Sequence, residues 1–160
     1  MSNAKVAKSW PPHFALARSV SKNPTIVYMT IATGNTIEKG MALALSSGEI
    51  AEAASTSGQL FGIAAADGDA GDEIAVYAGD RNNVFIGQVD NADISSQTYP
   101  AECDIVEVSN EHRVDIGASV EDVLLVLGPV SEDDLTDTTD GARVYFQIKR
   151  SSYDDLVAAR

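Results

Sequence analysis

Residues 61–79 of the chain, FGIAAADGDAGDEIAVYAG, contain a group of carboxylates that could hold a cation, act in catalysis or form the solvated turn of a hairpin. The group consists of Asp67, Asp69, Asp72 and Glu73. A calcium loop has oxygen ligands at alternate positions, a glycine sixth and a glutamate twelfth, between two helices. Here the alternation ends at Gly71 and both flanks resemble strands. Because Gly68 and Gly71 supply the positive φ angles of tight connections, we predict a structural turn and no metal site.

A second acidic segment, SEDDLTDTTD, spans residues 131–140. A glycosidase pair requires two carboxylates at a defined separation in a cleft, one with a raised pKa. This run is interrupted by threonines and closed by Asp140-Gly141, so we predict an exposed loop. The two histidines, His13 and His112, stand near no nucleophile elbow, zinc-protease, phosphate-loop or dinucleotide motif. We therefore predict that the chain is not an enzyme and uses no cofactor.

The composition is that of an ordinary single domain. The chain has 160 residues, of which 44% are hydrophobic, enough for a substantial core. No apolar run approaches the roughly 18 residues of a membrane helix, and the first 30 residues lack the pattern of a signal peptide. The lone cysteine, Cys103, cannot form an internal disulfide and is expected to be a buried apolar side chain. These features predict a soluble protein of intracellular origin.

Charge is distributed unevenly along the chain. The net charge is −13, yet residues 1–37 carry four basic residues and no acidic one. Nucleic-acid binding depends on a basic surface, so the acidic remainder argues against a nucleic-acid partner. The asymmetry suggests that the two parts face different surroundings, although a purely solubilising charge is an equal alternative.

From Thr25 onward, short β-branched and aromatic segments alternate with Gly, Asp and Ser clusters. Turn signals roughly every eight to twelve residues are typical of an all-β sandwich or barrel. We therefore predict a compact all-β domain of short antiparallel strands, with short helices only around residues 119–124 and in the C-terminal SYDDLVAAR. The expected strands are residues 25–32, 40–45, 49–54, 60–66, 73–79, 82–90, 103–109, 112–117, 122–128 and 143–149.

The N-terminal segment has no sustained hydrophobic period. Pro11 and Pro12 disfavour an early helix, yet Trp10 and Phe14 are side chains that a disordered tail rarely carries. Such a segment can fold over its own domain or over a neighbour's. We expect an extended arm over residues 1–24 and a β domain over residues 25–160, which could divide into subdomains of about 25–92 and 93–160.

The order of segments in residues 37–85 resembles that of one family. IEKGMALALSSGEIAEAASTSGQLFGIAAADGDAGDEIAVYAGDRNNVF runs from a Lys-Gly strand start through a Ser-Ser-Gly turn. It continues with a Phe-Gly-Ile-Ala-Ala-Ala segment and an Ala-Gly-Asp-Glu strand opening. This succession resembles the β domains of tailed-bacteriophage head decoration, or capsid cement, proteins. Residues 101–150 do not align with that pattern.

The resemblance implies a structural virion protein. Such proteins bind the outer surface of an assembled capsid and clamp neighbouring major capsid subunits. The implied partners are the major capsid protein and further copies of the chain, as a homotrimer, with no nucleic acid and no membrane. The implied location is the capsid surface of the virion, after synthesis in the bacterial host cytoplasm. In the arm, the residues expected to contact the capsid are Lys5, Lys8, Trp10, Phe14 and Arg18.

Two alternatives come from other classes of protein. A carbohydrate- or receptor-binding β module of a spike or fibre would need aromatic side chains exposed on a concave face. The aromatic side chains available are Tyr77, Phe85, Tyr99, Tyr145, Phe146 and Tyr153. Most of them alternate within predicted strands, which favours the core. A cellular β-barrel enzyme or chaperone-like domain is disfavoured by the missing catalytic motifs.

Overall fold

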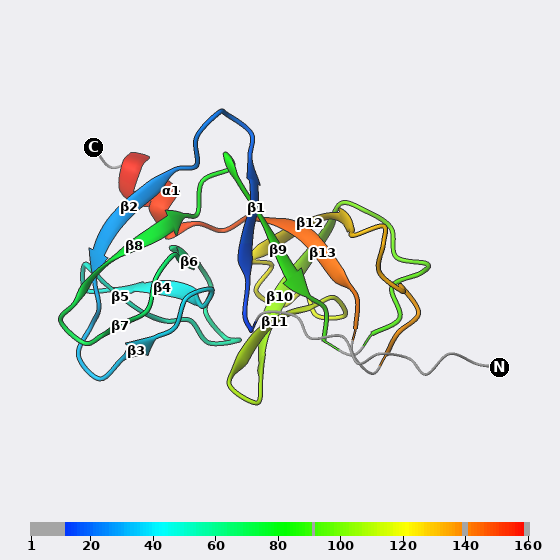
Figure 1. Cartoon of the computed structure of the whole chain (residues 1–160), viewed down its shortest axis with the longest axis horizontal. Coiled ribbons are helices and arrows are strands. Elements are labelled where there is room, and N and C mark those ends of the chain that lie inside the picture. The colour runs from blue at the N-terminus through cyan, green and yellow to red at the C-terminus, as the bar shows by residue number, and fades with distance from the viewer. Residues whose placement is uncertain (1–11, 91, 139–140, 159–160) are drawn as a thin grey trace.

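The structure, a computed structural model, describes residues 12–90, 92–138 and 141–158. This part of the chain forms antiparallel sheets and one short helix (Figure 1). All ten strands expected from the sequence are present, so the all-β prediction is confirmed. The arrangement is sandwich-like and neither large sheet is a closed barrel.

One sheet has five strands and occupies the left of Figure 1. Its order is β2-β8-β6-β4-β5, and every neighbouring pair is antiparallel. A two-stranded sheet of β3 (Thr36–Ile37) and β7 (Gly68–Asp69) lies beside it. The five strands are β2 (Ile26–Thr30), β4 (Ala42–Ser46), β5 (Glu49–Glu52), β6 (Gly62–Ala64) and β8 (Glu73–Ala78).

The other sheet has six strands in the order β1-β9-β13-β12-β10-β11. Both large sheets curl, since single bridges bring Ile31 to Ile50 and Val89 to Val114. The six strands are β1 (Ala15–Ser19), β9 (Asn83–Gln88), β10 (Ala101–Val108), β11 (Glu111–Asp115), β12 (Leu124–Pro129) and β13 (Arg143–Ile148).

Alternation along the central strands explains why these residues form sheets. In β13, Val144, Phe146 and Ile148 are fully buried, while Tyr145 and Gln147 between them are half-buried. Side chains point to opposite faces at successive strand positions, so one face enters the core. Burial of each such large apolar side chain stabilises the fold by about 1.5–3 kcal/mol.

Two apolar clusters make up the core. One lies within the five-stranded sheet, around Phe61, Leu43 and Ile74. The larger cluster combines Phe85, Phe146 and the rest of the six-stranded sheet with residues of the five-stranded sheet such as Ile63. The two sheets therefore share one core and hold each other in place.

The N-terminal part of the structure corrects the expected arm. We placed the first strand at Thr25, but residues 15–19 already form β1, paired with β9. The sequence ALARS does not indicate a strand, because it has no β-branched residue. In the structure, all five of its residues are half-buried or exposed, so it also lacks the buried apolar face of a central strand. Backbone pairing and the burial of Phe14 just before it hold this strand.

The sheets also divide the chain differently from the two expected subdomains. The boundary falls between β8 and β9 rather than near residue 92, and β1 joins the later strands. The predicted C-terminal helix is present as α1 (Ser152–Ala158). Residues 119–124 are not helical, because the buried carboxylate of Asp104 accepts three successive N–H groups from Val120 to Asp122. Nowhere in the described ranges is a helix long and apolar enough to cross a bilayer.

Candidate interaction surface

The acidic loop after β6 is a turn whose carboxylates accept backbone hydrogen bonds. Asp67 Oδ1 accepts the N–H of Lys39 at 2.6 Å, and Asp72 Oδ2 accepts the N–H of Asp69 at 2.9 Å. Gly71 has a φ of 88°, a conformation that favours glycine. These carboxylates therefore have the turn-forming role that the sequence predicts for them.

The second acidic segment is only partly the exposed loop that we predicted. Asp133 and Asp137 are buried. Asp133 accepts from the backbone N–H of Arg143 at 2.8 Å and from its guanidinium at 3.0 and 3.1 Å. This charge-assisted contact raises the pKa of Arg143 and fixes the loop to β13. The segment is thus partly a structural element, held to β13 through Asp133.

Of the five residues that we expected to contact a capsid, the structure describes two. Lys5, Lys8 and Trp10 lie outside the described residues. Arg18 is exposed, with its guanidinium carbon 5.4 Å from the centre of the Tyr145 ring. Phe14 is only 3% exposed and packs edge-on against Phe146 at 4.9 Å, so it belongs to the core of its own chain. Phe14 is therefore corrected from a contact residue to a core residue.

The aromatic residues considered for a glycan-binding face do not form one exposed cluster. Phe85 and Phe146 are fully buried, as the strand alternation predicts. The four tyrosines of that set are half-buried. An aromatic residue outside the set, Tyr28 on β2, is 67% exposed. No local pattern distinguishes Tyr28 from the other tyrosines, because exposure of an edge-strand side chain depends on the order of strands in the sheet.

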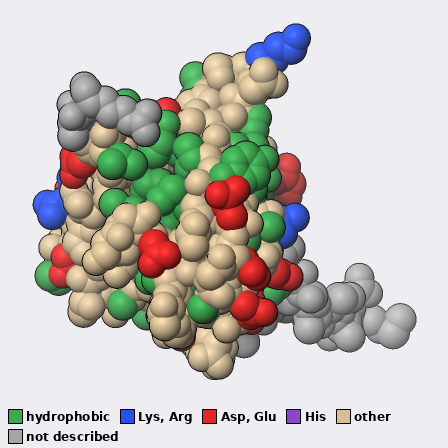
Figure 2. Space-filling model, turned by 90° about the vertical axis from the view of Figure 1, so that its left-hand side faces the viewer, with side chains coloured by type: hydrophobic (Ala, Val, Ile, Leu, Met, Phe, Trp, Pro, Cys, Tyr) green, Lys and Arg blue, Asp and Glu red, His purple; other side chains and the backbone are tan. Residues whose placement is uncertain are grey.

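An apolar groove lies between β2 and α1. Its volume is about 320 Å³. The groove is lined by Val27, Tyr28, Met29, Phe61, Tyr153, Leu156 and Val157. Figure 2 shows this side of the molecule, with hydrophobic side chains gathered over the upper part and carboxylates around and below them. A continuous apolar surface of this kind is typical of an interaction site.

The strand beside the groove has an unpaired edge. β2 pairs with β8 on one side. On its other side β5 approaches only at the end, where Ile31 bridges Ile50, and no strand of the described chain pairs along Ile26–Thr30. Ile26 is 43% exposed, and Leu156 of α1 is 40% exposed. An open strand edge next to apolar pockets can accept an extended segment of a partner by backbone pairing.

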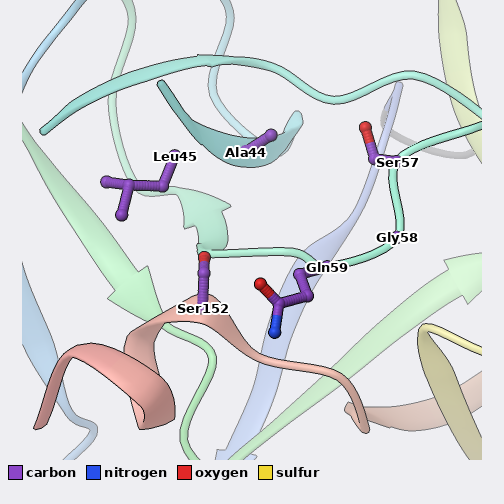
Figure 3. Close-up of a pocket in the computed structure, with 6 residues that line it drawn as sticks. All are labelled: Ala44, Leu45, Ser57, Gly58, Gln59 and Ser152. Carbon is purple, nitrogen blue, oxygen red and sulfur yellow. The ribbon is translucent and has the colours of Figure 1, made fainter. Parts of the chain in front are cut away.

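A second hollow, of about 480 Å³, lies at the start of α1 (Figure 3). It is lined by Ala44, Leu45, Ser57, Gly58, Gln59 and Ser152. The buried hydroxyl of Ser152 has no hydrogen-bond partner among the described residues. No histidine is among the six lining residues, so Ser152 lacks the adjacent base that activates a nucleophilic serine.

Two buried histidines meet where the sheets join. His112 on β11 is 1% exposed, and its Nδ1 accepts the N–H of Ala42 on β4 at 2.9 Å. His13, 5% exposed, accepts the N–H of His112 on its own Nδ1 at 3.1 Å. The Nε2 atoms lie 2.8 Å from Glu38 for His13 and 3.1 Å from Glu52 for His112. The two rings are edge-on at 5.5 Å.

Glu52, Glu107 and His112 place one potential metal-ligand atom each within 4.8 Å of one another. Neutral imidazole carries one proton, and Nδ1 of His112 already accepts the Ala42 N–H, so the proton must be on Nε2. A metal at Nε2 would require that nitrogen to be free of its proton. The hydrogen bonds therefore favour a His112–Glu52 contact over a metal centre.

Cys103 is fully buried, as the sequence predicts. Burial, with further contributions from Asp104 and Asp115, raises the pKa of its thiol to about 11. Because the thiolate is the reactive form, Cys103 is a packing residue rather than a nucleophile.

Comparison with known proteins adds no family to these observations: the chain matches no protein-family model and no curated protein. Sequence reasoning missed the histidine junction, because its two rings are 99 positions apart. The only local signal was the hairpin of β10 and β11, in which Glu107 stands directly opposite His112.

Proposed function

We propose that this chain is a structural virion protein that binds the outer surface of an assembled phage capsid and clamps neighbouring major capsid subunits. The observation that carries the proposal is the apolar groove beside the open edge of β2. An extended loop of a capsid subunit would extend the five-stranded sheet there and place its apolar side chains against Tyr28 and Leu156. The resemblance of residues 37–85 to decoration proteins supports the capsid as the partner.

Charge around the groove supports a cationic or neutral partner segment. Asp154 and Asp155 lie in the first turn of α1. Burial, followed by the nearby charge of Asp80, raises the pKa of Asp154. A partner segment with a basic side chain would relieve this repulsion, whereas an acidic one would increase it. The net charge of −13 over the whole chain would keep coated particles from adhering to one another.

Binding of the proposed decoration protein would stabilise the capsid by mass action. A protein that binds only the assembled lattice stabilises the lattice relative to its free subunits. When one decoration oligomer contacts several subunits, the second and later contacts gain from high effective concentration. Weak binding at each single groove is therefore enough for a large total stabilisation of the capsid lattice.

The segment before β1 is the second part of the proposed contact surface. Lys5, Lys8 and Trp10 precede the described residues, and Arg18 is exposed on β1. A tryptophan at the centre of an interface commonly contributes about 2 kcal/mol or more. The cations would add a salt-sensitive part of the affinity. Phe14 has no part in this surface because it lies in the core.

Binding to empty capsids of the chain's own phage tests the proposal. Tyr28→Asp, Leu156→Asp and Trp10→Ala should each reduce co-sedimentation with capsids by about tenfold or more, since each removes a contact of hot-spot size. Val120→Asp is the matched control, because Val120 is an apolar side chain that is 83% exposed and lies far from the groove in the sequence. Full capsid occupancy by all three variants would contradict the proposal, as would equal loss for the control.

A further inference from the structure

The histidine junction connects three parts of the fold. His112 is on β11 of the six-stranded sheet, and its contacts Ala42 and Glu52 are on β4 and β5 of the five-stranded sheet. His13 precedes β1 and contacts Glu38 in the loop before β4. The neighbouring N–H of Phe14 donates to the carbonyl of Gly40 at 2.9 Å. Both sheets and the N-terminal segment therefore meet at two imidazole rings.

The hydrogen bonds specify the neutral form of both rings. Each Nδ1 accepts a backbone N–H, and each Nε2 lies against a carboxylate. A neutral ring with its proton on Nε2 satisfies both contacts. An added proton must go to Nδ1, where it would face the N–H of Ala42 or of His112. Two donors would then oppose each other in a buried site, which costs the hydrogen bond and the desolvation of the backbone group.

We propose that His112, through its contacts with Ala42, Glu52 and His13, is a pH-sensitive latch that holds the N-terminal segment and the two sheets together at neutral pH and opens on acidification. Opening would break the bond from the Ala42 N–H to Nδ1 of His112 first. Residues 12–19 would then lose one of their attachments to the core. The backbone at His13, with a φ of 64°, is in the left-handed region, so this attachment is held against a local preference for release.

The groups around the latch shift the pKa of His112 in opposite directions. Those that face the two rings are Glu52 on β5, Glu107 on β10, Glu38 before β4, and the other histidine. Burial lowers the pKa of His112 and is the largest effect, the charge of His13 lowers it further, and Glu52 and Glu107 oppose the shift. The unfolded chain therefore takes up this proton at a higher pH than the folded chain. Stability contributed by His112 is complete above the ordinary histidine value of 6.5 and declines as pH falls below it.

Nuclear magnetic resonance of the full ¹⁵N-labelled chain tests the latch directly. At about pH 7.5, the ring nitrogens should show the proton on Nε2 of both histidines. Amide hydrogen exchange, corrected for its intrinsic pH dependence, should then be followed to about pH 5.5. Protection of the Ala42 amide, which donates to Nδ1 of His112, should fall by up to about tenfold per pH unit below 6.5. The Phe146 amide, in the centre of the six-stranded sheet, should keep its protection.

Two variants separate the latch from general acid sensitivity. His112→Asn retains an acceptor near the Nδ1 position but does not titrate, so the pH dependence at Ala42 should disappear. Glu52→Gln removes the charge that raises the pKa of folded His112, so the His112 ring titration should move to lower pH, while Ala42 protection should fall at least as steeply on acidification as in the natural chain. If His112→Asn does not fold, the ring signals of the natural chain and the Glu52→Gln shift still decide. A proton on Nδ1 at neutral pH, unchanged Ala42 protection between the two pH values, or an unshifted His112 titration in Glu52→Gln would overturn the proposal.

Discussion

Asn83 binds backbone groups at the ends of two neighbouring strands. It is fully buried at the start of β9. Its amide nitrogen donates to the carbonyls of Thr25 and Ala78 at 2.8 and 2.9 Å, and its Oδ1 accepts the N–H of Thr25 at 3.0 Å. One side chain thus fixes the entry to β2 and the exit from β8.

Asn83→Ala should lower the free energy of unfolding by about 2–3 kcal/mol, because it leaves the Thr25 N–H and the Ala78 carbonyl without the partner that Asn83 supplies, whereas the Thr25 carbonyl keeps the N–H of Ala78. Asn23→Ala is the matched control: Asn23 is exposed, and its carbonyl rather than its side chain accepts the neighbouring bonds. The control should change stability by less than about 0.5 kcal/mol. Urea unfolding followed by circular dichroism measures both, and equal costs would contradict the assigned role of Asn83.

At the scale of elements, the strands that we predicted correctly are those whose pattern is local. β8 and β13 carry alternating β-branched and aromatic residues, and their period is visible in the sequence. β1 was missed because pairing with β9 and burial of Phe14 hold it, and both partners are distant in sequence. The helix expected near residue 119 was wrong because a distant carboxylate, Asp104, takes the N–H groups of that turn.

The ring of Phe14, just before β1, packs over Gly87 of β9, and this contact gives a prediction about that glycine. A Cβ at Gly87 on β9 would lie 2.4 Å from the Phe14 ring and 3.1 Å from that of Phe146. Gly87→Ala should therefore cost about 1–3 kcal/mol through overpacking. Gly128 on β12 has open space at the same atom, so Gly128→Ala should be near neutral. Thermal unfolding of both variants tests this, and a neutral Gly87→Ala would mean that Phe14 is not packed in the core in solution.

At the scale of the whole molecule, composition predicted the class of fold but not the surfaces. Ten of the thirteen strands in the described residues and the excess of acidic residues follow from the sequence, since both depend on local properties. The groove and the histidine junction depend on which strands become neighbours. β2 and α1 are more than 120 residues apart, and no residue of either indicates the other.

The isolated chain is expected to form a trimer, as the resemblance to decoration proteins implies. A ring of three copies would present three β2 grooves to the subunits that meet at a threefold capsid junction, and would leave each groove free for its capsid segment. Light scattering coupled to gel filtration measures the mass. Because the chain is strongly acidic, higher salt should favour association by screening the repulsion between copies. A stable dimer at all salt concentrations would contradict this prediction.

The position of β1 beside β9 has a consequence for engineering the chain. Everything from β2 to β8 is inserted between two adjacent strands of the other sheet. The ends of this insertion meet, since Ser21 donates its N–H to the Asn82 side chain, 61 positions away, at 2.7 Å. A unit whose entry and exit touch can be exchanged without moving β1 or β9, provided that its replacement also covers the core that the two sheets share around Ile63.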